Sequence, residues 1–229
     1  MRARLRAALT TATRELSAEI ALLRTLLPPA TPDLSPGAIG IWPACREEQG
    51  LPPCPQERPF DLALSLFAYR EKVREGIRAA KYAGRSDVAH IFARMLHEAI
   101  RGGWADRFPA GFRPTIVPVP IRPAKYLQRG YNLPALVALP LGRLAGWPCD
   151  PLLLRRTGEL RPQAGSPRSL REENIRGAFA VRPGARVPPG ILLVDDVVTS
   201  GATVAACART LKNAGAAHIV VLTVARANL

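Results

Sequence analysis

The chain is poor in cysteine and aromatic residues and has no long apolar run. Its 229 residues include four cysteines and 6% aromatic residues, and four scattered cysteines are too few for a disulfide framework in a chain of this length. No stretch approaches the roughly 18 uninterrupted apolar residues of a membrane-spanning helix. Charged residues interrupt the richest stretches, namely Arg143, Asp195, Asp196 and Arg209. A disulfide scaffold and a membrane span are therefore excluded, and a cytoplasmic location is expected.

Acidic residues are also scarce, since 18 Asp and Glu stand against 32 Lys and Arg and leave a formal net charge of +14. A surface of this charge attracts polyanions such as nucleic acids. Only four of the cations are lysines, however, and the others are arginines. A GC-rich genome alone can produce a composition rich in arginine, alanine and proline. Stacking of single-stranded bases needs aromatic side chains; Trp104, Tyr126 and Tyr131 are candidates, with packing as the alternative. Charge alone leaves nucleic-acid binding open.

Residues 1–59 differ in pattern from the rest of the chain. Apolar residues recur every three or four positions between Leu5 and Leu27, which predicts an amphipathic helix. Charged residues fall where the apolar core of a secretory leader would lie, so the segment is interpreted as mature sequence. Residues 28–59 are rich in proline and have no sustained period, as in a linker or a small irregular subdomain. We expect the main domain to cover residues 60–229.

The first part of the main domain carries mixed patterns. Apolar spacing over residues 60–100 predicts two successive helices, and the β-rich residues 115–121 predict a short buried strand. A helix is predicted over 133–146, although Pro140 should interrupt it. The polar residues 150–190 predict a strand flanked by mobile loops.

The clearest architecture lies near the C-terminus. Residues 190–196 form an apolar run that closes in two acids, and residues 199–203 form a turn of small residues. A helical pattern over 204–216 and a second β-branched run over 218–226 follow. Strand, turn, helix and strand in this order predict a βαβ unit, and hence an α/β fold with a parallel sheet.

The turn between the first strand and the helix has the composition of an anion site. The first backbone N–H groups of a helix have no helical partner, and the helix dipole favours negative charge there. Thr199, Ser200 and Thr203 add hydroxyl donors. Gly201 and Ala202 allow close approach to the main chain. These residues predict a phosphate site.

Asp195 and Asp196 precede this turn and would repel a bare phosphate. The ligand should therefore also offer hydroxyl groups or a divalent cation, as a sugar phosphate does. The alternative is that the two acids merely end a strand while Thr199 or Ser200 caps the helix. A Walker-type loop is excluded, because no Gly-Lys-Ser/Thr follows the turn.

The segment LLVDDVVTSGAT, residues 192–203, resembles the phosphoribosyl-pyrophosphate (PRPP) signature of type I phosphoribosyltransferases. Residues 69–84, 117–132 and 177–179 are similar, in order and spacing, to segments of the ComF family of competence proteins. The resemblance implies a type I phosphoribosyltransferase fold, a parallel twisted sheet flanked by helices. It also implies that Asp195 and Asp196 bind ribose and that the turn from Thr199 to Thr203 binds the 5′-phosphate.

The resemblance implies roles for three further groups of residues. A pyrophosphate loop would contain Arg122, Lys125, Arg129 and Gly130; for Arg129 the alternative is a solvated surface cation. A mobile loop would contain Gln163, Arg171 and Asn174. The catalytic residues would be Asp195, Asp196 and Arg129. Mg²⁺ is expected to arrive with PRPP, without a direct protein ligand.

The N-terminal segment departs from the family pattern. Many family members carry two Cys-x-x-Cys pairs, consistent with a zinc ribbon, whereas this chain has Trp42-Pro-Ala-Cys45 and Cys54-Pro-Gln-Glu57. A tetrahedral zinc site needs four good ligands, so this ribbon-like segment is expected not to bind zinc. The histidines form no ligand cluster, and Cys149 and Cys207 are expected to be small buried residues.

Two functions of different classes follow from these features. The resemblance implies a protein that binds PRPP or a related sugar phosphate and assists uptake of single-stranded DNA in natural transformation, with competence-machinery proteins as partners. The intact acids and turn also suit an active phosphoribosyltransferase that transfers phosphoribose to a nucleobase or amine. A third possibility is a regulator that senses PRPP while holding nucleic acid.

Overall fold

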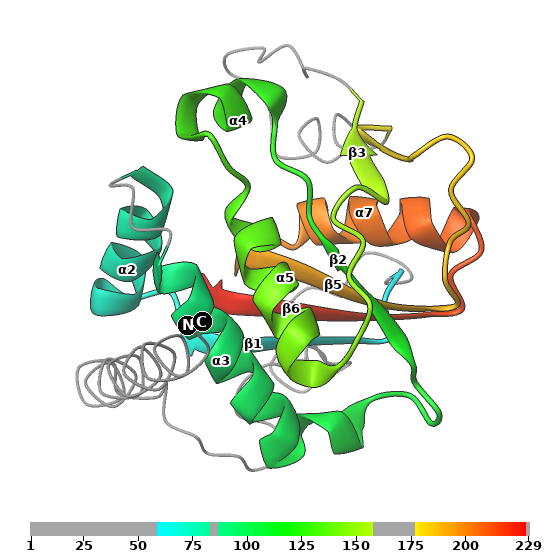
Figure 1. Cartoon of the computed structure of the whole chain (residues 1–229), viewed down its shortest axis with the longest axis horizontal. Coiled ribbons are helices and arrows are strands. Elements are labelled where there is room, and N and C mark those ends of the chain that lie inside the picture. The colour runs from blue at the N-terminus through cyan, green and yellow to red at the C-terminus, as the bar shows by residue number, and fades with distance from the viewer. Residues whose placement is uncertain (1–58, 83–86, 158–176, 228–229) are drawn as a thin grey trace, which may run out of the picture.

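A computed structural model of the chain contains one sheet of four parallel strands, in the order β1-β6-β5-β2 (Figure 1). The strands are β1 (Leu62–Ala68), β2 (Pro114–Pro118), β5 (Gly190–Val198) and β6 (His218–Arg226). The structure describes residues 59–82, 87–157 and 177–227. The predictions for residues 1–58, with the N-terminal helix and the ribbon-like segment, and for the loop of Gln163, Arg171 and Asn174 lie outside these residues.

The two central strands are apolar along most of their length, as expected for strands covered on both faces. In β5 the residues from Ile191 to Val194 are buried, and in β6 those from Ile219 to Ala225. The crossover helix α7 (Ala202–Asn213) joins them. The predicted parallel βαβ unit and the α/β class are confirmed. Because all four strands are parallel, their carboxyl ends lie at the same edge of the sheet.

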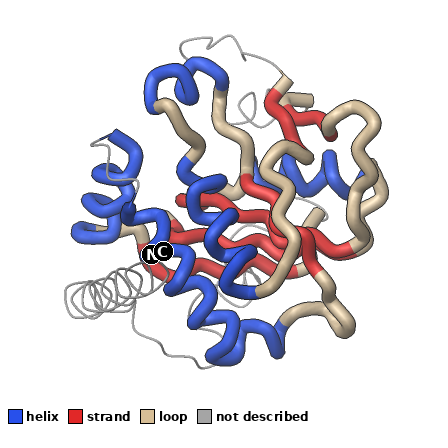
Figure 2. The backbone as a smooth tube through the Cα atoms, in the orientation of Figure 1, coloured by secondary structure: helices blue, strands red, loops and turns tan. Residues whose placement is uncertain are grey.

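Helices cover both faces of this sheet (Figures 1 and 2). On one face pack α2 (Glu71–Tyr82), α3 (Asp87–Ala99) and α5 (Leu133–Ala145). Their core with the sheet includes Ile77, Phe92, Leu96, Val137, Leu141 and Leu192. On the other face lie α7 and a short antiparallel pair, β3 (Leu154–Arg156) and β4 (Phe179–Val181). Their core with the sheet includes Leu154, Phe179, Ile191, Leu193, Val204 and Leu211.

The remaining helical elements connect these layers. They are the π-helical turn η2 (Ile100–Trp104), the 3-10 turn η3 (Ala105–Arg107) and the short helix α4 (Pro123–Arg129). Within the described part of the chain, no helix is long and apolar enough to cross a membrane.

Three local predictions are corrected by the structure. Residues 62–68 form β1 rather than the start of a helix, because a short apolar run fits both periods and pairing with β6 decides between them. Helix α5 continues through Pro140, since the packing of Val137 and Leu141 compensates for the one helical hydrogen bond that proline removes. Within residues 150–190 the structure has two short strands, β3 and β4, instead of one.

Candidate functional site

The signature residues lie at the carboxyl edge of the sheet, on the end of β5 and the turn into α7. Strand β5 continues two residues beyond Asp196, to Val198. Thr199 and Ser200 are exposed, and Gly201 has a positive φ of 78°, a conformation that favours glycine. The Ser200 hydroxyl accepts a hydrogen bond from the backbone N–H of Ala202 at 3.4 Å. The turn therefore presents hydroxyl and backbone donors at the start of a helix of 12 residues.

The two carboxylates of the signature point to opposite faces of β5, because side chains alternate along a strand. Asp195 follows Ile191 and Leu193 on the face covered by α7. Asp196 follows Leu192 and Val194 on the face covered by α2, α3 and α5. The carboxylates can reach a common ligand only over the edge of the sheet, which is where the turn from Thr199 to Thr203 lies.

Asp196 forms an ion pair with Lys81, a residue that the sequence prediction did not include. The Lys81 ammonium donates to Asp196 Oδ1 at 2.7 Å, and the two side chains are 19% and 11% exposed. Lys81 belongs to the last turn of α2, 115 residues earlier in the chain. It therefore neutralises one of the two signature acids from a different layer of the fold.

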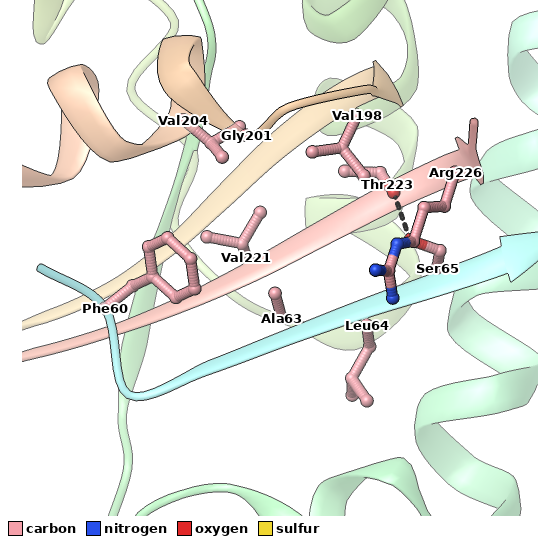
Figure 3. Close-up of a pocket in the computed structure, with 10 residues that line it drawn as sticks. All are labelled: Phe60, Ala63, Leu64, Ser65, Val198, Gly201, Val204, Val221, Thr223 and Arg226. Atoms are coloured by element: carbon pink, nitrogen blue, oxygen red, sulfur yellow. Dashed lines mark hydrogen bonds between the residues drawn. The ribbon is translucent and has the colours of Figure 1, made fainter. Parts of the chain in front are cut away.

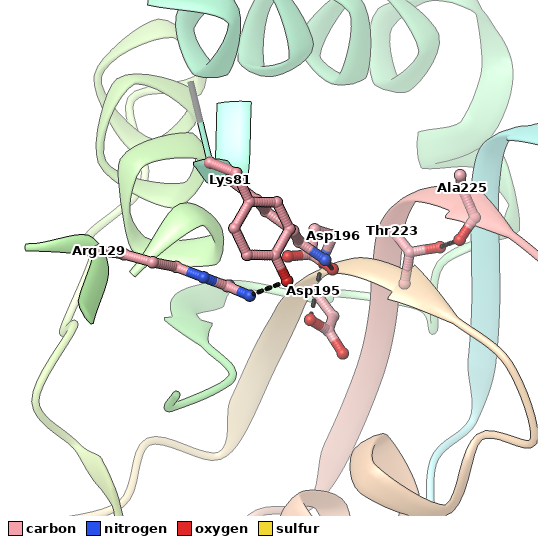
Figure 4. Close-up of polar contacts among 7 residues, drawn as sticks. Lys81, Arg129, Asp195, Asp196, Thr223 and Ala225 are labelled. Carbon is pink, nitrogen blue, oxygen red and sulfur yellow. Dashed lines mark hydrogen bonds and ion pairs between the residues drawn. The ribbon is translucent and has the colours of Figure 1, made fainter. Parts of the chain in front are cut away.

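The end of α2 also contacts the predicted pyrophosphate loop (Figure 4). Arg129 donates to the Tyr82 hydroxyl at 2.7 Å, and its guanidinium lies 4.6 Å from the centre of the Tyr82 ring. The Tyr131 hydroxyl donates to the carbonyl of Ala80. The signature strand, the predicted pyrophosphate loop and the end of α2 thus meet at one place.

Asp195 carries a raised pKa, of about 8. Burial is the largest cause, and the negative charge of Asp196 adds to it. The hydrogen bond that Asp195 accepts from the backbone N–H of Asp196, at 2.8 Å, and the charge of Lys81 oppose the shift. At neutral pH Asp195 is therefore mainly protonated, and Asp196 is paired with a cation. This arrangement reduces the repulsion that two free carboxylates would exert on a phosphate.

The predicted pyrophosphate loop contains the short helix α4. Arg122 occupies the position before the first residue of α4, makes no side-chain cap and is exposed. Lys125 is also exposed and donates to Gln128 at 3.0 Å. Gly130 ends the helix with a positive φ of 79°. Of the loop cations, Arg129 is tied to α2 by Tyr82, whereas Arg122 and Lys125 remain available to a ligand.

Arg156 on β3 is a further cation that the sequence prediction missed. Its guanidinium lies 5.0 Å from the centre of the ring of Phe179, its partner in β4. Its Nε is buried, and it has no hydrogen-bond partner among the described residues. Burial and the nearby charge of Arg122 lower the pKa of Arg156. Arg156 and Arg122, which come from two separate elements, are therefore close enough for their charges to interact.

Two cysteines, Cys149 and Cys207, lie in the described part of the chain. Cys207 is buried on the α7 face, and its pKa is raised by burial and by the charge of Asp195. Cys149 is half-buried, and burial raises its pKa to about 11. Across the residues that the structure describes, no group of three or more His, Cys, Asp and Glu could hold a metal ion.

Comparison with known proteins identifies relatives of this chain, although no family model matches it. The DNA utilization protein YhgH of Salmonella typhi is 28% identical over 190 residues, which are 80% of this chain and 82% of that protein. Competence protein F of Haemophilus influenzae is 29% identical, over 75% and 76% of the two chains. Competence protein ComFC of Streptococcus pneumoniae is 28% identical, over 71% and 67%. The chain is thus similar to competence proteins of the ComF type.

Two solved structures overlap part of this chain. The glutamine PRPP amidotransferase from B. subtilis overlaps with a TM-score of 0.36 and 17% identity, over 62% of this chain and 26% of that chain. The hypoxanthine-guanine phosphoribosyl transferase from L. donovani has a TM-score of 0.36 and 13% identity, over 60% and 67%.

Proposed function

We propose that this chain binds PRPP, or a related sugar phosphate, together with Mg²⁺ at the carboxyl edge of the sheet. We propose further that it assists the uptake of single-stranded DNA in natural transformation, as a protein of the cytoplasm that works with competence-machinery proteins. The observation that supports the first part is the convergence of Asp195, Asp196 and the exposed turn after β5 with Lys81 and the loop cations. The names of the relatives, competence protein F and DNA utilization protein, support the second part.

Each part of a sugar phosphate has a chemically suitable partner in the site. The turn from Thr199 to Thr203 offers donors to the 5′-phosphate. The two carboxyl groups offer oxygens to the ribose hydroxyls. Arg122 and Lys125 offer cations to the pyrophosphate, and Arg156 lies near enough to Arg122 for their charges to interact. Mg²⁺ would be held by the pyrophosphate oxygens, because the described residues offer no cluster of ligands for it.

The second candidate function, an active phosphoribosyltransferase, is favoured by the intact acids and loop cations. Cations and Mg²⁺ would stabilise the departing pyrophosphate as phosphoribose passes to a nucleobase or amine. In the described residues the cavity beside the turn holds about 10 Å³, enough for roughly one water (Figure 3). Its lining includes Val198, Gly201 and Thr223. This cavity is too small for a nucleobase, so it does not serve as the acceptor site. Pyrophosphate release from PRPP in the presence of one nucleobase would establish the enzyme.

Calorimetric titration with PRPP and Mg²⁺ tests the proposed site. We expect micromolar binding by the natural chain and at least a roughly hundredfold loss in the double variant Asp195→Asn, Asp196→Asn, because the charge-assisted interaction of Asp196 and the hydrogen bonding of Asp195 with the ribose are both changed. Circular dichroism serves as the folding control. If a folded double variant keeps the affinity of the natural chain, the signature is not the ligand site.

The same titration tests the role of Arg156. Arg156→Met should weaken PRPP binding about tenfold, because a charged hydrogen bond contributes roughly 1.5–3 kcal/mol. The matched control is Arg155→Met, which removes the same charge from the exposed neighbouring residue. Equal affinities in the two variants would mean that Arg156 does not contact the ligand.

A further inference from the structure

A stripe of arginines runs along the exposed side of α2. Arg70, Arg74 and Arg78 are four residues apart, and all three are exposed. The carbonyl of Arg70 accepts hydrogen bonds from the backbone N–H groups of Val73 and Arg74. Arg70 is therefore in register with the residues of α2. Residues four apart share one face of a helix, at a rise of about 6 Å. Continuing this spacing leads to Tyr82, which is 59% exposed.

The stripe continues from α2 onto α4. Tyr82 is held against Arg129 by the hydrogen bond of 2.7 Å and the ring contact of 4.6 Å described above. One turn before Arg129, α4 presents the exposed Lys125 and Tyr126, the latter 50% exposed. The cations and aromatic rings of two helices distant in sequence thus form one path.

Helix α4 has no buried residue. A helix of seven residues has too few hydrogen bonds to be stable by itself, and packing against a core is the usual source of its stability. Leu127, the residue after Tyr126, is 84% exposed. Since α4 contributes nothing to the core, its exposed side chains are available for a partner, and Lys125 and Tyr126 are among them.

We propose that this surface binds single-stranded nucleic acid and leads it to the edge of the sheet where the signature lies. We call it the α2–α4 track, and it consists of Arg70, Arg74, Arg78, Tyr82, Lys125 and Tyr126. The inference rests on the proposed function in DNA uptake and adds the surface that would carry it out.

The chemistry of the track fits a single strand better than a duplex or an acidic protein. The cations can contact successive phosphates, and the rings of Tyr82 and Tyr126 can stack on bases. Bases are open to such stacking only where they are not paired inside a duplex. The exposed carboxylate of Glu75 lies beside the arginine stripe on α2. Its negative charge would repel a phosphate. The strand is therefore expected to follow the arginines and not the Glu75 side.

Fluorescence anisotropy with an oligothymidylate tests the track in the full chain. We expect the double variant Arg74→Gln, Arg78→Gln to bind roughly tenfold more weakly at low salt. Its plot of log affinity against log salt should be shallower by about 1.4, at about 0.7 for each lost phosphate contact to a single strand. The matched control is Arg186→Gln, Arg209→Gln, which removes the same charge from exposed residues outside the track and should leave affinity and slope nearly unchanged.

Tyr126→Ala tests the stacking contribution separately. Loss of one base–aromatic contact should weaken binding roughly fivefold to a hundredfold and should leave the salt dependence unchanged. Comparing the affinities for an oligouridylate and for the oligothymidylate distinguishes RNA from DNA as the bound strand. A duplex of the same sequence should bind more weakly than the oligothymidylate.

The outcomes separate this inference from the proposed function. If the natural chain binds no single strand, the proposed role in DNA uptake fails. If it binds, but the track variants and the charge-matched control lose equal affinity, the track is wrong while the DNA role stands. Both track variants should keep the PRPP affinity of the natural chain, because none of their substitutions touches a signature residue.

Discussion

Replacing Lys81 with methionine should lower the free energy of unfolding by roughly 2–4 kcal/mol, because it leaves the carboxylate of Asp196 buried without its cation. The distance of 2.7 Å and the low exposure of both side chains make this pair different from a surface salt bridge. Loss of one partner from a buried pair is costly, since the remaining charge stays desolvated. Chemical denaturation at neutral pH measures the change.

A double-mutant cycle identifies the cause of this destabilisation. The chain with both Lys81→Met and Asp196→Asn should recover most of the lost stability, because no unpaired charge remains. The matched control is Lys72→Met, an exposed lysine on the same helix, which should change stability by about 0.5 kcal/mol or less. If the double variant is as unstable as Lys81→Met alone, the methylenes of Lys81 rather than its charge support the fold.

The same pair has a consequence for ligand binding. A ligand whose hydroxyls approach Asp196 must share this carboxylate with Lys81, which contacts only Oδ1. Lys81→Arg keeps the charge but changes its geometry, so it should retain more stability than Lys81→Met. The expected order of PRPP affinities is natural chain, then Lys81→Arg, then Lys81→Met. Titration of the three chains under identical Mg²⁺ concentrations measures this order.

The parts of the fold that the sequence predicted are those built from neighbouring residues. The unit β5-α7-β6 lies within residues 190–226 and shows its strand and helix periods directly. Likewise, Asp195, Asp196 and the turn that follows are contiguous, so the candidate phosphate site could be recognised locally. By contrast, β1 could not be separated from a helix, because its identity depends on pairing with β6, more than a hundred residues later.

The residues that the prediction missed come from distant segments. Lys81 lies in a segment that carries the family resemblance, yet no spacing in the sequence connects it to Asp196. Arg156 is one of two consecutive arginines, and only the fold shows that it packs on Phe179 while Arg155 is exposed. The protonation of Asp195 also depends on burial, which composition does not give. The site is therefore partly local in sequence and partly a product of tertiary packing.

Replacing Asp195 with asparagine should make the protein more stable at neutral and higher pH. The pKa of Asp195 is raised to about 8 in the folded chain, against about 3.9 for an ordinary aspartate. The folded chain therefore holds a proton that the unfolded chain releases, and the natural protein loses stability as the pH rises from about 4 to about 8. Asparagine is neutral throughout and can still accept the hydrogen bond from the backbone N–H of Asp196.

The advantage of the asparagine variant should thus depend on pH in a defined way. Below about pH 4 the two proteins should be equally stable, because Asp195 is then neutral in both states. Near pH 8 the variant should be more stable by roughly 1–3 kcal/mol. This difference is smaller than the free energy equivalent to the whole pKa shift, because Asp195 is partly exposed. Thermal unfolding across this range measures the difference, and Asp106→Asn, at an exposed position, is the control that should show no such trend.

A stabilising substitution at Asp195 that weakens PRPP binding would show that this acid is maintained for its ligand and not for the fold. Residues at binding sites often reduce stability in this way. Parallel stability curves for the natural chain and Asp195→Asn would mean instead that Asp195 is ionised at neutral pH. The site would then carry a second carboxylate charge, and the phosphate turn would need Mg²⁺ to offset it before any sugar phosphate could bind.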